Sequence, residues 1–84
     1  KKDPRTITIN VDSDGGMNIN MFRVNKTMLR QQLRAARAKH GNTVPIVIRG
    51  DRKALYENIE DVMETVGSVE LWRVKLAAES VKMK

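Results

Sequence analysis

The feature that most constrains the fold is the apolar run VPIVI, Val44–Ile48, which lies between two segments whose apolar residues have helical spacing. A continuous run rich in β-branched residues is typical of a strand that is buried on both faces or lies in the centre of a sheet. Pro45 lacks a backbone N–H, which a sheet tolerates near the start of a strand. The run therefore predicts a central strand that is preceded and followed by helices.

Two segments upstream alternate apolar and polar residues with the period of a half-buried strand. In the first segment the apolar residues are Ile7, Ile9 and Val11, and the polar residues are Thr6, Thr8 and Asn10. The second covers residues 17–22, and Arg23 and Val24 extend it. The cluster DSDGG between the two favours a turn, so an antiparallel hairpin is expected.

Residues 26–40 and 54–66 have the apolar spacing of amphipathic helices. Asn25 and Gly41 fit as the N-cap and C-cap of the first helix, and Asp51 fits as a cap of the second. In the last strand, residues 69–76, the apolar positions change phase before Trp72. This phase change indicates either a β-bulge or a strand whose first part lies elsewhere.

The element order is therefore ββαβαβ, which predicts a single small α+β domain with a mixed four-stranded sheet and two helices on one face. A chain of 84 residues suits one layer of helices on one sheet, because chains of this size bury only about 60% of their unfolded surface. The other face of the sheet is expected to be open to water or to a partner.

The side chains present argue against catalysis and cofactors. The chain has no cysteine and one histidine, which excludes a disulfide framework and a thiolate metal site. Asp12 and Asp14 resemble the start of a calcium loop, but Met17 and Arg23 replace its glycine and its bidentate glutamate. Nothing places a nucleophile, a base and an oxyanion donor together, so no enzyme is expected.

The net charge of +6 makes anionic partners plausible. A basic stripe on the first helix comprises Lys26, Arg30, Arg34 and Arg37. Aromatic residues for base stacking are scarce, and the loop and strand motifs of common RNA-binding domains are absent, so nucleic acid is not an expected partner. A small basic RNA-binding domain stays open as the weakest alternative.

Several features occur in register along residues 5–79. The apolar strand is followed by Asp51, then by a helix that Tyr56 opens and that contains Asp61–Met63, and then by Gly67 and a strand ending in VKLAAE. Upstream stand the hairpin ITINVDSDGGMNIN and the helix VNKTMLRQQL. With this order and spacing the chain resembles the periplasmic domain of the ExbD/TolR family, and its charged tail is more similar to ExbD than to TolR.

The resemblance implies a periplasmic domain of a single-pass inner-membrane protein of a Gram-negative bacterium. Family members act with an ExbB-like or TolQ-like subunit in a motor driven by the proton-motive force. They pass mechanical work to TonB or TolA, which energises outer-membrane transport. Residues 1–4 are then expected to be a linker from a transmembrane anchor, 5–77 the periplasmic domain, and 78–84 a flexible tail. A homodimer is also implied.

An exposed sheet edge suits such a role, because an extended peptide can add to it as a further strand. The expected edges for dimerisation, or for a TonB-like linker, are residues 6–11 and the last strand with Trp72, Arg73, Val74, Lys75 and Leu76. We expect the ring of Trp72 to lie in the core. The positive charge favours an acidic linker whose binding weakens as salt rises. The alternative is a TolR-like anchoring module whose basic surface binds peptidoglycan carboxylates.

Overall fold

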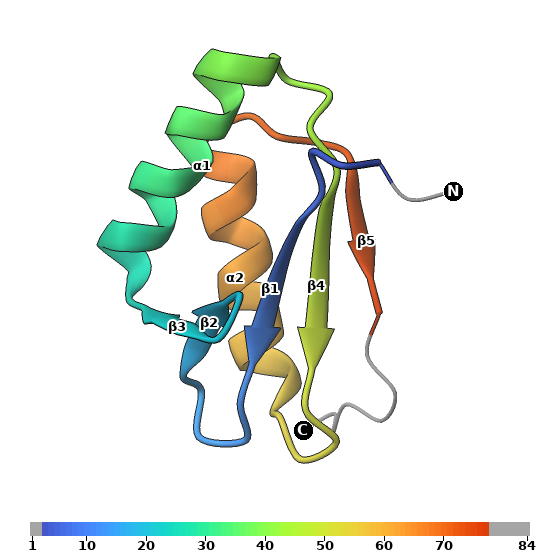
Figure 1. Cartoon of the computed structure of the whole chain (residues 1–84). Coiled ribbons are helices and arrows are strands. Elements are labelled where there is room, and N and C mark those ends of the chain that lie inside the picture. The colour runs from blue at the N-terminus through green and yellow to red at the C-terminus, as the bar shows by residue number, and fades with distance from the viewer. Residues whose placement is uncertain (1–2, 78–84) are drawn as a thin grey trace.

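The computed structural model describes residues 3–77, which form one mixed sheet and two helices (Figure 1). The strands are β1 (Ile7–Val11), β2 (Met17–Ile19), β3 (Phe22–Val24), β4 (Ile46–Gly50) and β5 (Val74–Leu76). The helices are α1 (Lys26–His40) and α2 (Tyr56–Ser68). The α+β class and the two helices are as predicted, but the sheet has five strands where four were expected.

The additional strand results from a turn inside the segment that was expected to be one strand. Asn20 and Met21 both have positive φ angles, 52° and 69°, as in the two-residue turns whose twist suits antiparallel strands. The turn sets Ile19 opposite Phe22 and separates β2 from β3. The backbone conformation of two residues thus converts the predicted extension of one strand into a second hairpin.

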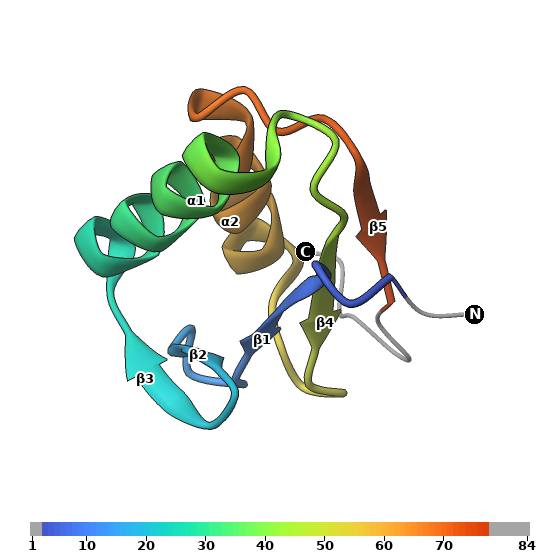
Figure 2. The same cartoon turned by 45° about the horizontal axis from the view of Figure 1, so that its top comes forward.

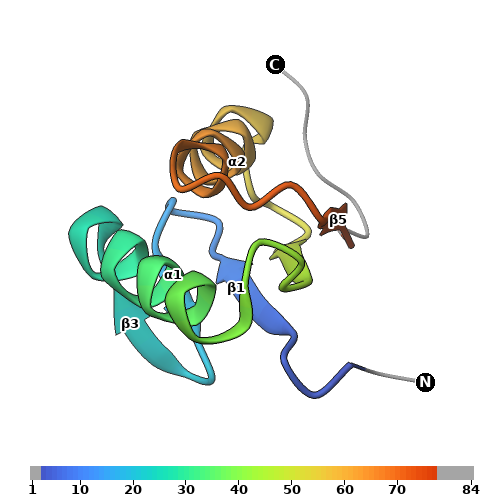
Figure 3. The ribbon, with the colours of Figure 1, turned by 90° about the horizontal axis from the view of Figure 1, so that it is seen from above.

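The strand order in the sheet is β3-β2-β1-β4-β5. The first three strands form antiparallel pairs, whereas β1 with β4 and β4 with β5 are parallel. The two parallel pairs are connected through α1 and α2, and both helices lie on the same side of the sheet, as the view from above shows (Figure 3). The predicted central strand Val44–Ile48 corresponds to β4, with β1 and β5 as its neighbours.

Both predicted caps of α1 are present. The N–H of Met28 donates to Asn25 Oδ1 at 2.8 Å, and the N–H of Gly41 donates to the carbonyl of Arg37 at 2.7 Å. The Gly41 backbone has φ 83° and ψ −175°, a conformation that is essentially restricted to glycine. The first helix therefore ends where the sequence provides the one residue type that permits this backbone.

The second helix begins two residues later than predicted, at Tyr56, and no side chain caps it. The expectation that Asp51 caps this helix is wrong. Asp51 Oδ1 accepts from the N–H of Lys53 at 2.9 Å, and the Asp51 carbonyl accepts from the N–H of Ala54. Because its oxygens close this tight turn, Asp51 stabilises the link between β4 and α2 rather than the helix itself.

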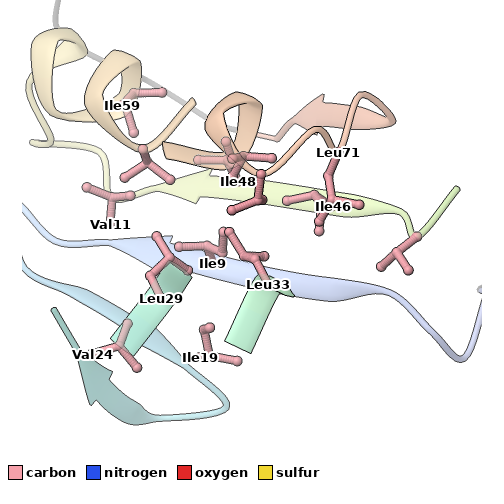
Figure 4. Packing of buried hydrophobic residues seen from close by; sticks show 14 of the residues in the cluster. Ile9, Val11, Ile19, Val24, Leu29, Leu33, Ile46, Ile48, Ile59 and Leu71 are labelled. Carbon is pink, nitrogen blue, oxygen red and sulfur yellow. The ribbon is translucent and has the colours of Figure 1, made fainter. Parts of the chain in front are cut away.

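The two helices pack on one side of the sheet (Figure 2), and the hydrophobic core lies between them and the sheet (Figure 4). Ile9 of β1 and Ile46 and Ile48 of β4 point toward the helices and are completely buried. The helices contribute Leu29, Leu33, Ile59, Val62 and Val66. Each fully buried aliphatic side chain of this kind contributes about 1.5–3 kcal/mol, so this layer accounts for most of the stabilisation that the domain obtains from burial.

The residues between these core positions point to the opposite, helix-free face of the sheet, where Thr8, Asn10 and Val47 are partly exposed and Arg49 is exposed.

Across residues 3–77, neither helix combines the length and the apolarity that a bilayer span requires. Residues 1–2 of the expected linker and the expected tail, 78–84, lie outside the described residues. The proposed domain boundaries therefore stay predictions.

Candidate functional site

Two strands, β3 and β5, form the edges of the sheet in the part of the chain that the structure describes. The leading strand, Thr6–Val11, was expected as the other edge, but β1 lies between two neighbouring strands. On one side β1 pairs with β4 along its whole length, and on the other side Asn10 and Val11 pair with β2. Because both its sides carry neighbouring strands, β1 has no free edge for a partner over the paired residues.

The last strand is shorter than predicted, since only Val74–Leu76 pair with β4. Residues 69–73 form a connection in which Val69 and Leu71 are buried and Glu70 has a φ of 61°. The phase change seen in the sequence is therefore the end of this connection and not a bulge. Trp72 and Arg73, which were expected in the strand, immediately precede it.

Apolar side chains are exposed along this edge. The exposed fractions are 69% for Trp72, 37% for Val74 and 42% for Leu76. Val74 and Leu76 are in register with the buried Ile46 and Ile48, so they point to the helix side of the sheet. Val74 and Leu76 stay partly exposed because β5 lies to one side of both helices, so that neither helix covers these side chains completely (Figure 3). The expectation that Trp72 belongs to the core is wrong, since most of its surface is accessible.

One flank of α2 faces this edge. A Cβ atom at Gly67 would lie 3.6 Å from Cζ3 of Trp72, and Met63, one helical turn earlier, is 39% exposed. The same flank has a shallow hollow of about 330 Å³ lined by Tyr56, Glu60, Met63 and Glu64. We call the exposed apolar residues Met63, Trp72, Val74 and Leu76 the β5 edge surface.

The main-chain groups of β5 complete this surface. The carbonyl of Arg73 accepts from Ile46, and the N–H of Ala77 donates to Ile48, so the odd-numbered residues bond to β4. Successive residues of a strand direct their main-chain groups to opposite sides. The carbonyls of Val74 and Leu76 and the N–H of Leu76 therefore point outward, away from β4. The β5 edge surface combines a short row of available hydrogen-bonding groups with exposed apolar side chains.

Residues 1–80 match the family model described as Biopolymer transport protein ExbD/TolR. The chain belongs to the ExbD/TolR family. A comparison with curated proteins finds no match. Members of the ExbD/TolR family are membrane-anchored proteins of the cell envelope, and they work with ExbB-type and TonB- or TolA-type partners.

The five residues on which the ExbD/TolR resemblance rested occupy different places. Tyr56, Met63 and Gly67 lie on the α2 flank that faces β5, at spacings of seven and four residues. Asp61 lies on another flank, where its Oδ2 is 2.9 Å from Nζ of Lys26. Asp51 closes the turn after β4. Three of the five thus share one flank of α2, and the other two stabilise a turn and the contact between the helices.

The basic stripe of this ExbD/TolR domain does not form one open surface. Lys26 pairs with Asp61, and Nη2 of Arg37 lies 3.1 Å from Oε1 of Glu70. Within residues 3–77, Arg30 and Arg34 form no ion pair. Two of the four stripe residues therefore form ion pairs that connect α1 to α2 and to the segment that follows α2.

The other edge of the sheet is β3, which the sequence pattern did not predict. Met21, in the turn, is 93% exposed and Phe22 is 75% exposed. An asparagine at the first position of a two-residue turn between alternating segments is a signal of a hairpin, and Asn20 provided it. The signal was obscured because Met21 stands where glycine is the usual second residue.

The acidic side chains of the described chain do not form a metal site, and several of them pair with arginine or lysine instead. No group of acidic and histidine side chains within residues 3–77 is arranged to hold a metal ion. Asp12, part of the apparent calcium loop, lies 3.2 Å from Arg23 instead. Asp3 accepts hydrogen bonds from the Arg5 side chain and main chain, and these bonds hold the pKa of its carboxyl well below the ordinary range.

Proposed function

We propose that this domain is the periplasmic part of an ExbD-like subunit of a motor driven by the proton-motive force. In this role it has no catalytic activity and binds an extended segment of a TonB-like protein, through which mechanical work reaches the outer membrane. An ExbB-like subunit would act through a transmembrane helix of the same subunit. The observation that carries the proposal is the outward-facing main chain of β5 beside the exposed Trp72, Val74 and Leu76.

The two parts of the β5 edge surface have different tasks in strand addition. A hydrogen bond contributes only about 0.5–1.5 kcal/mol, so three outward groups fix the register of an added strand but bind it weakly. Burial of the apolar side chains would provide most of the affinity, at about 25 cal/mol per Å². The bound segment is therefore expected to direct apolar side chains at every second position toward Met63 and Trp72.

The same edge also serves a second copy of the domain. Exposed edges with unpaired main chain are templates for pairing, and proteins usually protect them. Lys75 is the one charged residue within β5, and its side chain points to the helix-free face, away from the apolar side chains. We propose that the β5 edges of two copies pair in the homodimer and that a TonB-like segment competes with or extends this pairing.

The experiment is an NMR titration of the ¹⁵N-labelled domain with the linker peptide of its cognate TonB-like protein. Amide shifts at residues 74–77 and at the Trp72 indole support strand addition at β5. The variant Leu76→Pro removes an outward N–H without removing a bond to β4, because proline is tolerated on an edge strand with its N side facing solvent. Binding should weaken about two- to tenfold beyond any loss in the control variant, as expected for one hydrogen bond, while the fold persists. Leu76→Thr, which keeps the N–H, is the matched control.

A different outcome of these experiments would support the TolR-like alternative over strand addition. If millimolar peptide causes no shifts and the domain cosediments with purified peptidoglycan, the protein is an anchoring module and the strand-addition proposal is wrong. If Leu76→Pro binds as tightly as the unchanged domain, the peptide uses another surface. Sedimentation of Leu76→Pro at several concentrations tests the dimer separately, since β5 pairing predicts a shift toward the monomer.

A further inference from the structure

The helix-free face of the sheet has a row of polar side chains across four strands. The strand register places Arg23 opposite Asn18, Asn18 opposite Asn10, and Asn10 beside Arg49. Neighbouring strands are about 4.8 Å apart, so the row from β3 to β4 is about 14 Å long. Paired residues point to the same face, and the four side chains therefore lie next to one another on the side that no helix covers.

The middle of this row is held in one orientation. Asn10 Nδ2 donates to Asn18 Oδ1 at 3.1 Å, and Arg23 Nη1 donates to Asp12 Oδ2 at 3.2 Å. These bonds leave the carboxamide oxygen of Asn10 and the amide N–H groups of Asn18 without a side-chain partner in the described part of the chain. An amide pair with a remaining donor and acceptor is suited to the main-chain amides of a peptide.

Two positive charges, one at the β4 end of the row and one on the neighbouring β5, are not neutralised by the domain. Arg49 and Lys75 are exposed, and neither forms an ion pair within residues 3–77. Lys75 is in register with Val47, two residues before Arg49, so the two cations are diagonal neighbours on β4 and β5. Diagonal neighbours in a sheet are about 7–8 Å apart. Alternate residues of an extended peptide are about 6.8 Å apart on one side.

We infer that the helix-free face binds an extended acidic peptide in which carboxylates occupy alternate positions, opposite Arg49 and Lys75. The spacing of the two cations matches that of the carboxylates, and the Asn10–Asn18 pair, on the other side of Arg49 from Lys75, bonds the peptide main chain as it continues across the sheet. The nearest aromatic residues, Phe22 and Trp72, do not belong to this row, since Phe22 is in register with the helix-side Ile19 and Trp72 lies against α2. Stacking with sugars or bases is therefore not available on this surface.

Nearby acidic groups determine how the peptide lies. Asp12 and Asp51 line a hollow of about 220 Å³ at the carboxyl ends of β1 and β4, together with Arg49. Their charges repel a second carboxylate there, so the acidic positions extend from Arg49 toward Lys75. At the opposite end of the strands, Arg73 lies 3.9 Å from Asp3 and is partly neutralised. This surface uses side chains of the sheet face, so it does not depend on the outward main chain of β5.

Two synthetic peptides of equal composition test the inference by ¹⁵N NMR titration of the whole chain at low salt. One repeats Glu-Thr, and the other repeats Glu-Glu-Thr-Thr. The alternating peptide is expected to bind more tightly and to shift the amides of residues 10, 18, 49 and 75. Arg49→Gln and Lys75→Gln should each weaken it about two- to fivefold, as expected for exposed ion pairs. Lys39→Gln, which removes one charge from exposed α1, is the control and should have no effect.

Several results would overturn the inference. Equal affinity of the two peptides, or an equal loss in Lys39→Gln, would mean that only net charge matters. Shifts confined to residues 74–77 and the Trp72 indole would assign the peptide to the β5 edge. Tighter binding of a single-stranded oligonucleotide, or of vesicles with anionic lipid, would assign the face to another partner. The variant Leu76→Pro should bind the alternating peptide normally, so failure of this inference and failure of strand addition are distinguishable.

Discussion

Trp72 lies against Gly67, so that a Cβ atom added to this glycine would be 3.6 Å from Cζ3 of the indole. This is an ordinary van der Waals distance, and Gly67 lies inside α2 with no positive φ. Gly67→Ala is therefore expected to raise the free energy of unfolding by about 0.5 kcal/mol, the low end of the range for a glycine within a helix, because Gly67 lies in the last turn of α2. Urea denaturation measures the gain. Gly67→Leu should instead displace the indole and shift its fluorescence, and a loss of stability in the alanine variant would contradict the prediction.

The turn between β2 and β3 contains a residue poorly suited to its backbone. Met21 has a φ of 69° and is 93% exposed, so its side chain gains little from packing. Met21→Gly should raise the free energy of unfolding by about 0.5–1 kcal/mol. Glycine removes the cost of about 1–2 kcal/mol that an L-residue has at positive φ. Part of this gain is offset because glycine loses more conformational entropy on folding. Asn20→Gly is the control with a smaller effect, since asparagine tolerates this region. A destabilised Met21→Gly would indicate that the methionine is buried by a partner in solution.

Gly41 is predicted to be indispensable for a purely conformational reason. Its φ is 83° and its ψ −175°, and no atom lies within 4 Å of a Cβ added there. Gly41→Ala should lower the free energy of unfolding by about 1–3 kcal/mol, the cost of a sparsely populated backbone region. A synthetic chain with D-alanine at this position should be stable, since the mirror image of this conformation is an ordinary extended one. Equal effects of the two alanine enantiomers would contradict the explanation.

The pair of Asp3 and Arg5 predicts how stability depends on pH. Hydrogen bonds from Arg5 lower the pKa of Asp3 below its ordinary value of 3.8, so the unfolded chain takes up this proton at a higher pH than the folded chain. The pair therefore stabilises the fold fully above about pH 4 and progressively less as the pH falls toward the folded pKa. Asp3→Asn should be less stable than the unchanged protein at pH 7, and the difference should shrink by pH 2.5. Urea denaturation at both values tests this, with Asp14→Asn as control.

Local rules predicted most of the fold. The alternation in residues 6–11 and 17–22, the run Val44–Ile48, the two helical patterns and the last segment, residues 69–76, predicted every element except β3. Asn25 and Gly41 cap the two ends of α1 as expected. These predictions succeeded because burial on one face imposes a period that the sequence records directly. The additional strand was not predicted because it depends on the positive φ angles of Asn20 and Met21. A methionine in the sequence gives no indication of a positive φ.

The candidate site was predicted only in part. The last strand was correctly expected to be an edge, but the leading strand was not distinguished from it, and Trp72 was expected in the core. An exposed edge and an interior strand have the same alternation of apolar residues. The position of β1 between β2 and β4, and that of Trp72 beyond the helices, depend on contacts between residues far apart in the chain.

The sequence by itself determined the elements, their order and the family to which the chain belongs, because these depend on local periodicity and on motifs in register. Tertiary structure decided which strands are edges, which half of the basic stripe is paired, and that Arg49 and Lys75 share the helix-free face. The physical reason is that strand pairing joins segments distant in sequence. A residue's neighbours across the sheet, unlike its neighbours along the strand, are set only when the whole domain folds.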